Sequence, residues 1–257
     1  NHIQLINGWD GKMKKQIHQF TILELLIVIS VITILCALLL PALNSVRKKA
    51  ESIQCVSNLK QSGTYMMMYC NAFDDWIPPP TAHRDNGLYT GGNFDDFDSL
   101  MTWARRLIMF VEGKEKTELW GNLRAYETYS CPSYPRVNCT TTEFVGYAAT
   151  YGLSNWLGGA WNTNVFVRLS SIGKKATDWV PAKSPGNTML LADTVFTNGK
   201  RQSCYWGTAQ NAVSARHSLQ ANAMMLDNSV RSLGIAALRT ACNGKDSKIY
   251  DMNCNEL

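Results

Sequence analysis

The sequence lacks the short motifs that mark the most familiar catalytic and nucleotide-binding sites. It contains no G-x-S-x-G nucleophile turn, no H-E-x-x-H metalloprotease pair, no Walker A loop and no G-x-G-x-x-G dinucleotide-binding loop. It has no C-x-x-C pair of the kind that holds zinc or forms a redox centre. No internal repeat or low-complexity tract is visible. These absences disfavour the common hydrolase, NTPase and repeat-protein classes.

The chain also lacks a strong excess of charge. Its 257 residues carry 25 Lys and Arg against 20 Asp and Glu. The first 19 residues hold three of the lysines and one of the aspartates, which leaves 22 basic and 19 acidic side chains in the rest. So small an excess, spread along the chain, does not form the basic patch of a nucleic-acid-binding protein. With 46% hydrophobic residues, the chain suits one globular domain and one additional element.

Cysteines, by contrast, are numerous. Eight of them are many for a cytosolic domain and favour an exported protein in an oxidising compartment. Cys36 lies in an apolar run, where we expect a small buried hydrophobe. Among the other seven, at least one has no intrachain partner. The sequence allows several disulfides and leaves the pairing open: Cys131 with Cys139, Cys242 with Cys254, or Cys55 with Cys131.

The longest apolar run, residues 20–43, contains a single charged side chain, Glu24. As a helix, its 24 residues would be about 36 Å long, enough to cross a hydrocarbon core of about 30 Å. Basic residues stand on both sides, at Lys14 and Lys15 and again at residues 47–49, so the charges do not set an orientation. An acid inside a membrane segment generally has a partner and a task. Glu24 is therefore expected to meet a cation.

The residues before this run are predicted to be a leader. The first methionine is Met13, and residues 1–12 are expected to be an upstream extension of the reading frame that is not native protein. Residues 13–19 hold two lysines and no apolar core of their own. A secretory signal would instead be cut behind the run, at small residues such as Ala37, Ala42 or Ser45, and this alternative stays open.

Beyond residue 43 the helical period continues. Apolar or small residues recur at steps of three or four, with charged residues between them, at Val46, Ala50, Ile53, Val56, Leu59, Gly63, Met66 and Cys70. The same helix is therefore expected to continue into a globular domain formed by residues 44–257 and to pack one apolar face against the rest of that domain. Pro41 removes a backbone hydrogen bond within the helix and predicts a bend there.

The segment "FTILELLIVISVITILCALLLPAL" resembles the N-terminal segment of type IV pilins and type II secretion pseudopilins, which follows the pattern F-T-L-I-E-L-L-V-V-I. The resemblance implies that a prepilin peptidase cuts between Gln19 and Phe20 and methylates the new amino terminus. It also implies that Glu24, at mature position five, pairs with the amino terminus of a neighbouring subunit during assembly. Gln19 departs from the glycine that usually precedes the cut.

Four further segments resemble the branch of this family that has a C-terminal His-x9-Asp-Gly element. They are "CVSNLKQSGTYMMMY" (55–69), "SCPS" (130–133), "MLLADT" (189–194) and "RHSLQANAMMLDNSVRSL" (216–233). Nine residues separate His217 from Asp227, and Asn228 replaces the glycine. Asp-Asn suits the positive φ of a two-residue hairpin turn, so "NAMML" and "SVRSL" are predicted to pair as strands.

Candidate chemistry is sparse. His217, Asp193 and Asp227 could form an acid/base or metal site, but a turn Asp usually caps its own backbone, and a single His beside a strand is usually structural. We therefore predict no catalytic residue, no metal ligand and no cofactor. Acidic clusters at residues 74–75 and 91–99 lack the EF-hand spacing but could bind Ca²⁺ in a loop. Related pseudopilins can use calcium in this way, so that option stays open.

Eight tryptophans raise the question of a sugar-binding surface. Trp103 and Trp120 lie in the expected helices "TWARRLIMFV" and "KTELWGNLRAY" and are predicted to be core residues. Trp156 and Trp161 lie in "SNWLGGAWNTN", a stretch rich in Gly, Asn and Ser that is typical of an exposed loop. They are the better candidates for stacking on a carbohydrate.

These observations predict an α+β, pilin-like fold, with a long N-terminal helix that is transmembrane in its first half and packed on an antiparallel sheet in its second. The expected function is structural and not enzymatic: a pilin or pseudopilin subunit of a type IV pilus or type II secretion filament. It would sit in the bacterial inner membrane as a single-pass protein with a periplasmic or extracellular domain, and its partners would be homologous subunits and a prepilin peptidase. The alternatives are a non-polymerising surface protein that binds carbohydrate and a membrane-tethered hydrolase that uses His217.

Overall fold

The computed structural model describes residues 21–78, 81–82, 101–113, 127–133, 151–154, 168–171, 184–196, 205–206, 211–241 and 249–250. Several predictions lie outside these residues. They are the leader (1–19) with the cut between Gln19 and Phe20, the helix with Trp120, the loop with Trp156 and Trp161, the acidic cluster at 91–99, and the pairing of Cys139, Cys242 and Cys254.

Helices and strands alternate irregularly along the described chain. In order, they are helix α1 (Ile22–Ala72), strands β1 (Thr81–Ala82) and β2 (Met101–Thr102), helix α2 (Trp103–Glu112), strand β3 (Gly152–Ser154), the 3-10 turns η3 (Leu169–Ser171) and η4 (Pro185–Asn187), strands β4 (Met189–Ala192), β5 (Thr194–Phe196), β6 (Tyr205–Trp206), β7 (Asn211–Ser214), β8 (Gln220–Met225) and β9 (Val230–Gly234), helix α4 (Ile235–Ala241) and strand β10 (Ile249–Tyr250).

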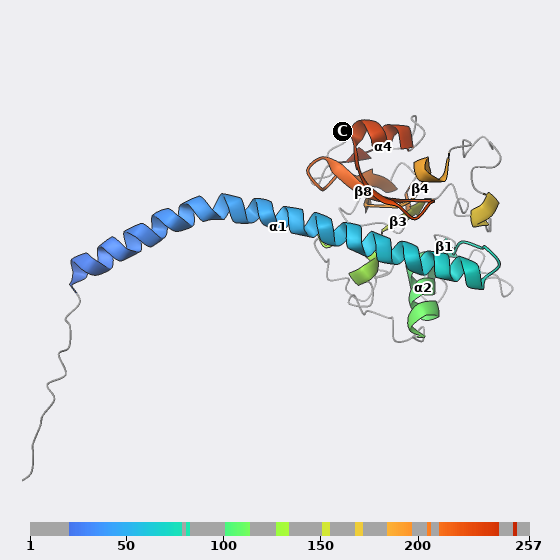
Figure 1. Cartoon of the computed structure of the whole chain (residues 1–257), viewed down its shortest axis with the longest axis horizontal. Helices are drawn as coiled ribbons and strands as arrows, with labels where there is room; N and C mark the ends of the chain where they lie inside the picture. Colours follow the sequence, from blue (N-terminus) through green and yellow to red (C-terminus); the bar gives the residue numbers. More distant parts are fainter. Residues whose placement is uncertain are drawn as a thin grey trace, which may run out of the picture. The chain divides into compact units, whose positions relative to one another are not determined.

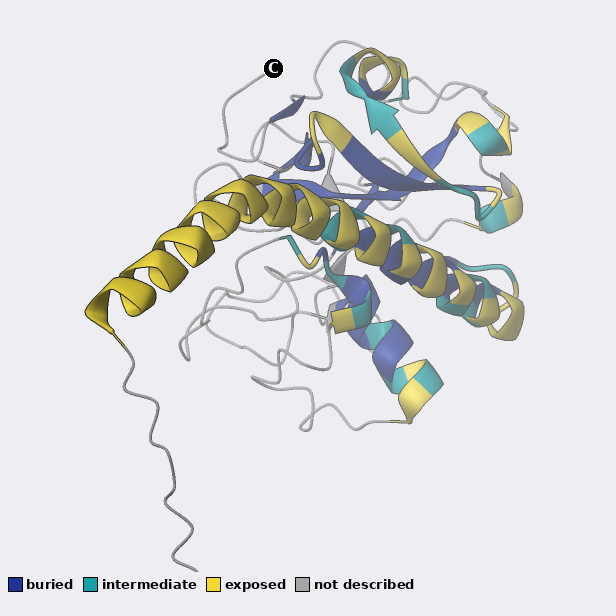
Figure 2. Cartoon of the chain, turned by 60° about the vertical axis from the view of Figure 1, so that its left-hand side comes forward, coloured by how far each residue is buried: buried dark blue, intermediate teal, exposed yellow. Residues whose placement is uncertain are grey.

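The predicted long N-terminal helix is present as α1, which continues without a break through Pro41 (Figure 1). It begins with a capping box. The Glu24 N–H donates to Thr21 Oγ1 at 3.2 Å, and Glu24 Oε2 accepts the Thr21 N–H at 2.9 Å. Every residue from 21 to 50 is exposed (Figure 2). The bend at Pro41 stays a prediction.

The buried face of α1 starts later than the sequence period predicts. Four predicted stripe residues, Leu59, Gly63, Met66 and Cys70, are buried, but Val46, Ala50 and Ile53 are exposed. The first buried residue is Cys55, and the face also includes the polar residues Asn58 and Ser62. These two side chains bond to backbone carbonyls of residues 127–130, so the helix is buried where another segment covers it and not along its whole apolar stripe.

The described strands form three sheets. The largest has the order β6-β3-β4-β8-β9, a second has the order β10-β7-β5, and β1 pairs with β2. Most pairs are antiparallel, whereas β3–β6 and β7–β10 are parallel. Leu190, Leu191 and Met224 of β4 and β8 belong to the same hydrophobic core as Leu59 and Met66 of α1. The predicted α+β layout of a long helix packed on an antiparallel sheet is therefore confirmed.

The hairpin formed by β8 and β9 confirms the predicted strand pair and corrects its turn. Met224 pairs with Val230, and the Met225 N–H donates to the Ser229 carbonyl. The Asn228 N–H donates to the Met225 carbonyl, and Asn228 has φ 60°. The connection is thus a three-residue loop whose last residue is left-handed, and not the two-residue turn expected from Asp-Asn. The predicted positive φ holds for Asn228.

Helix α2 confirms the helix predicted over "TWARRLIMFV" and begins at Trp103. The Thr102 side chain caps it by accepting the Arg105 N–H, and Gly113 follows its last turn with φ 63°. Trp103 is completely buried, as predicted, and its ring N–H donates to the Tyr151 carbonyl at 3.1 Å. This bond fixes the backbone at the start of β3, next to the site described below.

Candidate functional site

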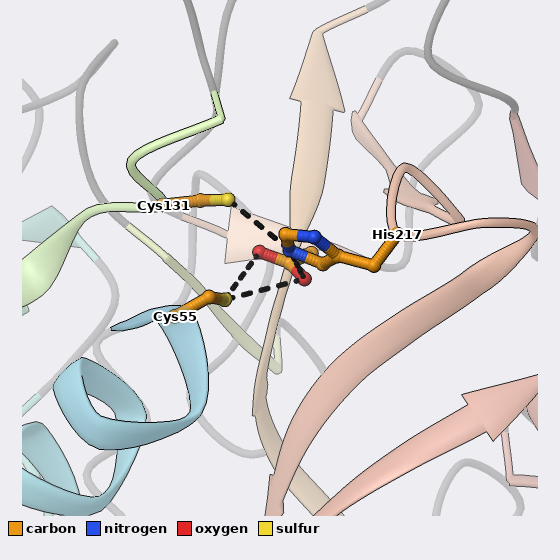
Figure 3. A group of neighbouring side chains, drawn as sticks. Cys55, Cys131 and His217 are labelled. Carbon is orange, nitrogen blue, oxygen red and sulfur yellow. Dashed lines mark hydrogen bonds and ion pairs between the residues drawn. The ribbon is translucent and has the colours of Figure 1, made fainter. Parts of the chain in front are cut away.

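Four buried side chains with metal-binding atoms lie together in the globular part of the chain. They are Cys55, Cys131, Asp193 and His217, and one ligand atom from each lies within 4.8 Å of all the others. Cys55 and Asp193 are completely buried, and the other two are less than one tenth exposed. Figure 3 shows the Cys55, Cys131 and His217 side chains converging from three different segments.

Cys55 and Cys131 are positioned by polar contacts on α1. Cys55 is the first buried residue of the helix, and the Tyr151 hydroxyl reaches both its carbonyl (3.2 Å) and its Sγ (3.4 Å). Cys131 follows a short helical turn at residues 127–129. Asn58 Nδ2 donates to the Glu127 and Ser130 carbonyls at 3.0 and 3.1 Å, which holds this turn against α1.

Asp193 lies where the chain changes sheets, between β4 of the five-stranded sheet and β5 of the three-stranded sheet. Its backbone N–H donates to the Asn222 carbonyl, and its carbonyl accepts the Ser214 N–H. Asp193 Oδ2 also accepts the Asn222 N–H at 3.0 Å. The backbone of Asp193 is therefore bonded to both sheets, and its carboxylate is bonded to β8.

His217 lies in the turn through which the chain returns from β7 to β8. The His217 and Gln220 backbones exchange two hydrogen bonds around Ser218 and Leu219, which have φ 55° and 63°. This tight turn directs the imidazole inward. Its Nε2 lies 3.3 Å from Asp193 Oδ2 and 3.4 Å from Cys131 Sγ.

Electrostatics couple the four groups. Burial disfavours a charged imidazole, but hydrogen bonds to Asp193 and Cys131 outweigh it and raise the pKa of His217 to about 10. Burial likewise opposes ionisation of Asp193, yet the hydrogen bond and charge of His217 and the charge of Arg216 lower its pKa. Without a metal, these two side chains form a buried ion pair.

The two thiols differ from each other. Burial, together with a hydrogen bond that Cys55 donates to Cys131 and the charge of Asp193, raises the pKa of Cys55. Burial also opposes ionisation of Cys131, but hydrogen bonds from Cys55 and His217 and the charge of Arg216 lower its pKa to about 7. Cys131 is thus the sulfur that ionises first.

The sequence analysis considered His217, Asp193 and Asp227 as one possible site, and the structure brings two of these three residues together. Asp193 and His217 are in contact, as that grouping required. Asp227 is not part of the cluster. It is exposed, and its Oδ1 accepts the Ser229 N–H at 2.9 Å and the Ser229 hydroxyl at 2.6 Å. The expected role of Asp227 as a cap on its own turn is confirmed.

The two cysteines of the cluster were not recognised as potential ligands in the sequence, although the signal was present. Cys55 and Cys131 were considered only as disulfide partners, either of each other or, for Cys131, of Cys139, and no disulfide joins Cys55 to Cys131 in this structure. Each residue of the cluster falls in a different one of the four segments quoted for the family resemblance. Four matched segments with one metal-binding side chain each could have suggested that these side chains converge.

The exposed part of α1 is the second candidate site. Glu24, for which the sequence demanded a cation, already has a local partner in Thr21, whose N–H and hydroxyl both donate to Oε2 at 2.9 Å. The Ser30 and Thr33 hydroxyls donate to the Leu26 and Ile29 carbonyls, one turn earlier, at 2.7 Å each. The two hydroxyls and Oε2 of Glu24 are therefore satisfied by local hydrogen bonds.

Of the two acidic clusters considered for calcium, the structure describes the one at residues 74–75. Asp74 Oδ2 lies 2.6 Å from Arg168 Nη2, and Asp75 Oδ2 accepts the Ser170 N–H at 2.8 Å. Arg168 also stacks over the Trp76 ring at 5.0 Å. These carboxylates hold two segments of the chain together.

No family model, no curated protein and no solved structure matches this chain.

Proposed function

We propose that the chain is a structural subunit of a type IV pilin-like or pseudopilin-like filament, held in a membrane by the first half of α1 before assembly. The observation that carries this proposal is the division of one continuous helix. Helix residues from Cys55 onward contribute to the domain core, whereas every residue from 22 to 46 is exposed. Such a helix is long and apolar enough to span a membrane.

The exposed segment requires an apolar environment. Between residues 22 and 46, sixteen large apolar side chains are exposed, most of them by half or more. Burial of one such side chain is worth about 1.5 kcal/mol or more of hydrophobic free energy. Leaving all of them in water therefore gives up a stabilisation on the order of 25 kcal/mol. That exceeds the net stability of a typical domain, about 5–15 kcal/mol. Lipid, and later the helices of neighbouring subunits, would supply the missing burial.

The polar residues of the segment suit such an environment. Hydroxyls that bond to carbonyls of their own helix, as in Ser30 and Thr33, leave no unsatisfied donor in lipid. Glu24 is the exception because it carries a full charge. Thr21 occupies only its Oε2, and among the described residues no donor reaches Oε1. In the proposed filament, Oε1 accepts the positive amino terminus of a neighbouring subunit.

Glu24→Gln separates this pairing from the capping role. Glutamine keeps the capping box, because its side-chain oxygen can accept the Thr21 N–H, but it has no charge to attract an amino terminus. We expect Glu24→Gln to leave the membrane insertion and folding of the subunit unchanged and to abolish its incorporation into filaments. The matched variant Thr21→Val weakens the cap and keeps the carboxylate, so it should still assemble. Normal incorporation of Glu24→Gln would refute the pairing.

Mass spectrometry of the mature amino terminus tests how the chain is processed. An N-methylated Phe20 supports the filament subunit. An intact Met13 start supports a simple membrane anchor, and a cut near Ala37 supports a secreted domain. The hydrolase alternative gains no support from the geometry, because His217 is buried in contact with Cys131 and Asp193.

A further inference from the structure

We propose that Cys55, Cys131, Asp193 and His217 bind one zinc ion as a closed, structural tetrahedral site. The proposal is independent of filament assembly, since all four residues belong to the globular part of the chain. It rests on the donor set, on the spacing of the ligand atoms, and on the groups that surround them.

Three of the six distances between the ligand atoms fit a tetrahedron around zinc, and all six are within 4.8 Å. Zinc lies about 2.3 Å from sulfur and about 2.0–2.2 Å from imidazole nitrogen or carboxylate oxygen, so tetrahedral angles place sulfur about 3.6 Å from nitrogen or oxygen, and nitrogen about 3.4 Å from oxygen. The Cys131 Sγ to His217 Nε2 distance is 3.4 Å, and the Cys55 Sγ to Asp193 Oδ2 distance is 3.6 Å. The His217 Nε2 to Asp193 Oδ2 distance is 3.3 Å.

The donor set selects zinc over the hard cations. Thiolate and imidazole ligands suit zinc, whereas calcium and magnesium require six or more oxygens or an octahedron of oxygens and water. Four protein ligands complete the tetrahedron and leave no position for water or substrate. Because the residues are buried, the site would stabilise the fold and not catalyse a reaction.

Surrounding groups complete the site. Zinc with two thiolates, one carboxylate and a neutral imidazole carries a net charge of −1, and the buried Arg216, whose charge acts on Cys131 and Asp193, offsets it. The Tyr151 hydroxyl lies within hydrogen-bond distance of Cys55 Sγ, and the Asn222 N–H donates to Asp193 Oδ2. Outer contacts of this kind orient metal ligands and tune their affinity.

The experiment is a metal analysis of the full chain, purified in detergent without chelator. We expect one zinc per chain by elemental mass spectrometry. Removal by a chelator should be reversed by added Zn²⁺. Replacement with Co²⁺ should give the strong visible absorption of tetrahedral cobalt and thiolate-to-cobalt charge-transfer bands. These measurements use the unaltered chain, so they do not depend on any variant folding.

Variants then assign the ligands. His217→Ala and Cys131→Ser should lose stoichiometric zinc, and Tyr151→Phe should weaken zinc binding about 10–100-fold, as outer contacts usually do. Cys70→Ala is the matched control: Cys70 is a buried free thiol on the same helix but outside the cluster, so this variant should keep its zinc.

Two results would overturn the proposal. One is a chain that binds neither Zn²⁺ nor Co²⁺ after chelation and whose four residues remain reduced and metal-free. The other is a Cys55–Cys131 disulfide in the purified protein, detected as a cross-linked peptide without reduction, because oxidised sulfurs cannot serve as thiolate ligands.

Discussion

Helix α1 lies close to β8 and to the turn after it at Gly63, and replacing this residue tests how tightly the helix packs there. A Cβ atom on Gly63 would overlap Met224 Sδ and Asn228 Oδ1. Met224 is completely buried, so its side chain has little room to move away. The glycine is therefore explained by the helix–sheet contact and not by any special φ.

The magnitude follows from two opposing effects. In an exposed helix interior, Gly→Ala would stabilise by about 1 kcal/mol through helix propensity. Here overpacking against Met224 and Asn228 costs about 1–3 kcal/mol or more, because atoms on both neighbours must shift. We expect the overpacking to prevail, so that Gly63→Ala destabilises the domain by up to about 2 kcal/mol, which lowers Tm by up to about 8 °C for a domain of this size.

The assay is thermal unfolding of the full chain in detergent, followed by tryptophan fluorescence, since Trp103 lies in the same core. Thr64→Ala, at the adjacent exposed position of α1, is the control and should change stability by less than about 0.5 kcal/mol. In a Met224→Ala background, Gly63→Ala should become neutral or stabilising, which a double-mutant cycle would measure as coupling. A Gly63→Ala variant that is more stable than the wild type would refute the close packing.

Two further predictions concern stability. Leu219 is exposed and has φ 63°, a conformation that asparagine tolerates better than leucine. Leu219→Asn should therefore raise Tm by about 2–4 °C in the same assay. A lower Tm would mean that the leucine makes a stabilising contact. Burial and the charge of Asp75 raise the pKa of Cys70 from 9.0 to about 12, so the folded state favours the neutral thiol. Its contribution is therefore complete below pH 9 and is lost as the pH rises from 9 toward 12, and Cys70→Ala should lose less stability over that range than the wild type. Equal losses in the two proteins would contradict the assigned pKa.

Local periodicity predicted the helices and strands themselves better than it predicted which segments pack against them. The apolar run and its continuation predicted α1, and "NAMML" and "SVRSL" predicted β8 and β9, because these patterns depend on residues that are close in sequence. The burial of Asn58 could not be predicted in this way. It depends on carbonyls of residues 127 and 130, which the sequence does not place beside α1.

The candidate site shows the same division. Asp193 and His217 could be grouped from sequence, but only the fold shows that both lie where the chain changes sheets and that Cys55 and Cys131 face them. For Glu24, a local signal was overlooked. Thr21 and Glu24 have the T-x-x-E spacing of a capping box, which accounts for an acid at the start of an apolar helix without any partner subunit. The case for inter-subunit pairing therefore rests on the unoccupied Oε1.

The position of Cys55 has a mechanical consequence. Along α1 it is the first residue that the domain buries, ahead of Leu59 and Met66. If the chain is part of a filament under tension, a pull on residues 22–46 reaches Cys55 before it reaches the apolar contacts. A metal bond at that point would transmit the force to two sheets and to the segment at Cys131. The helix would then not separate from the domain one side chain at a time.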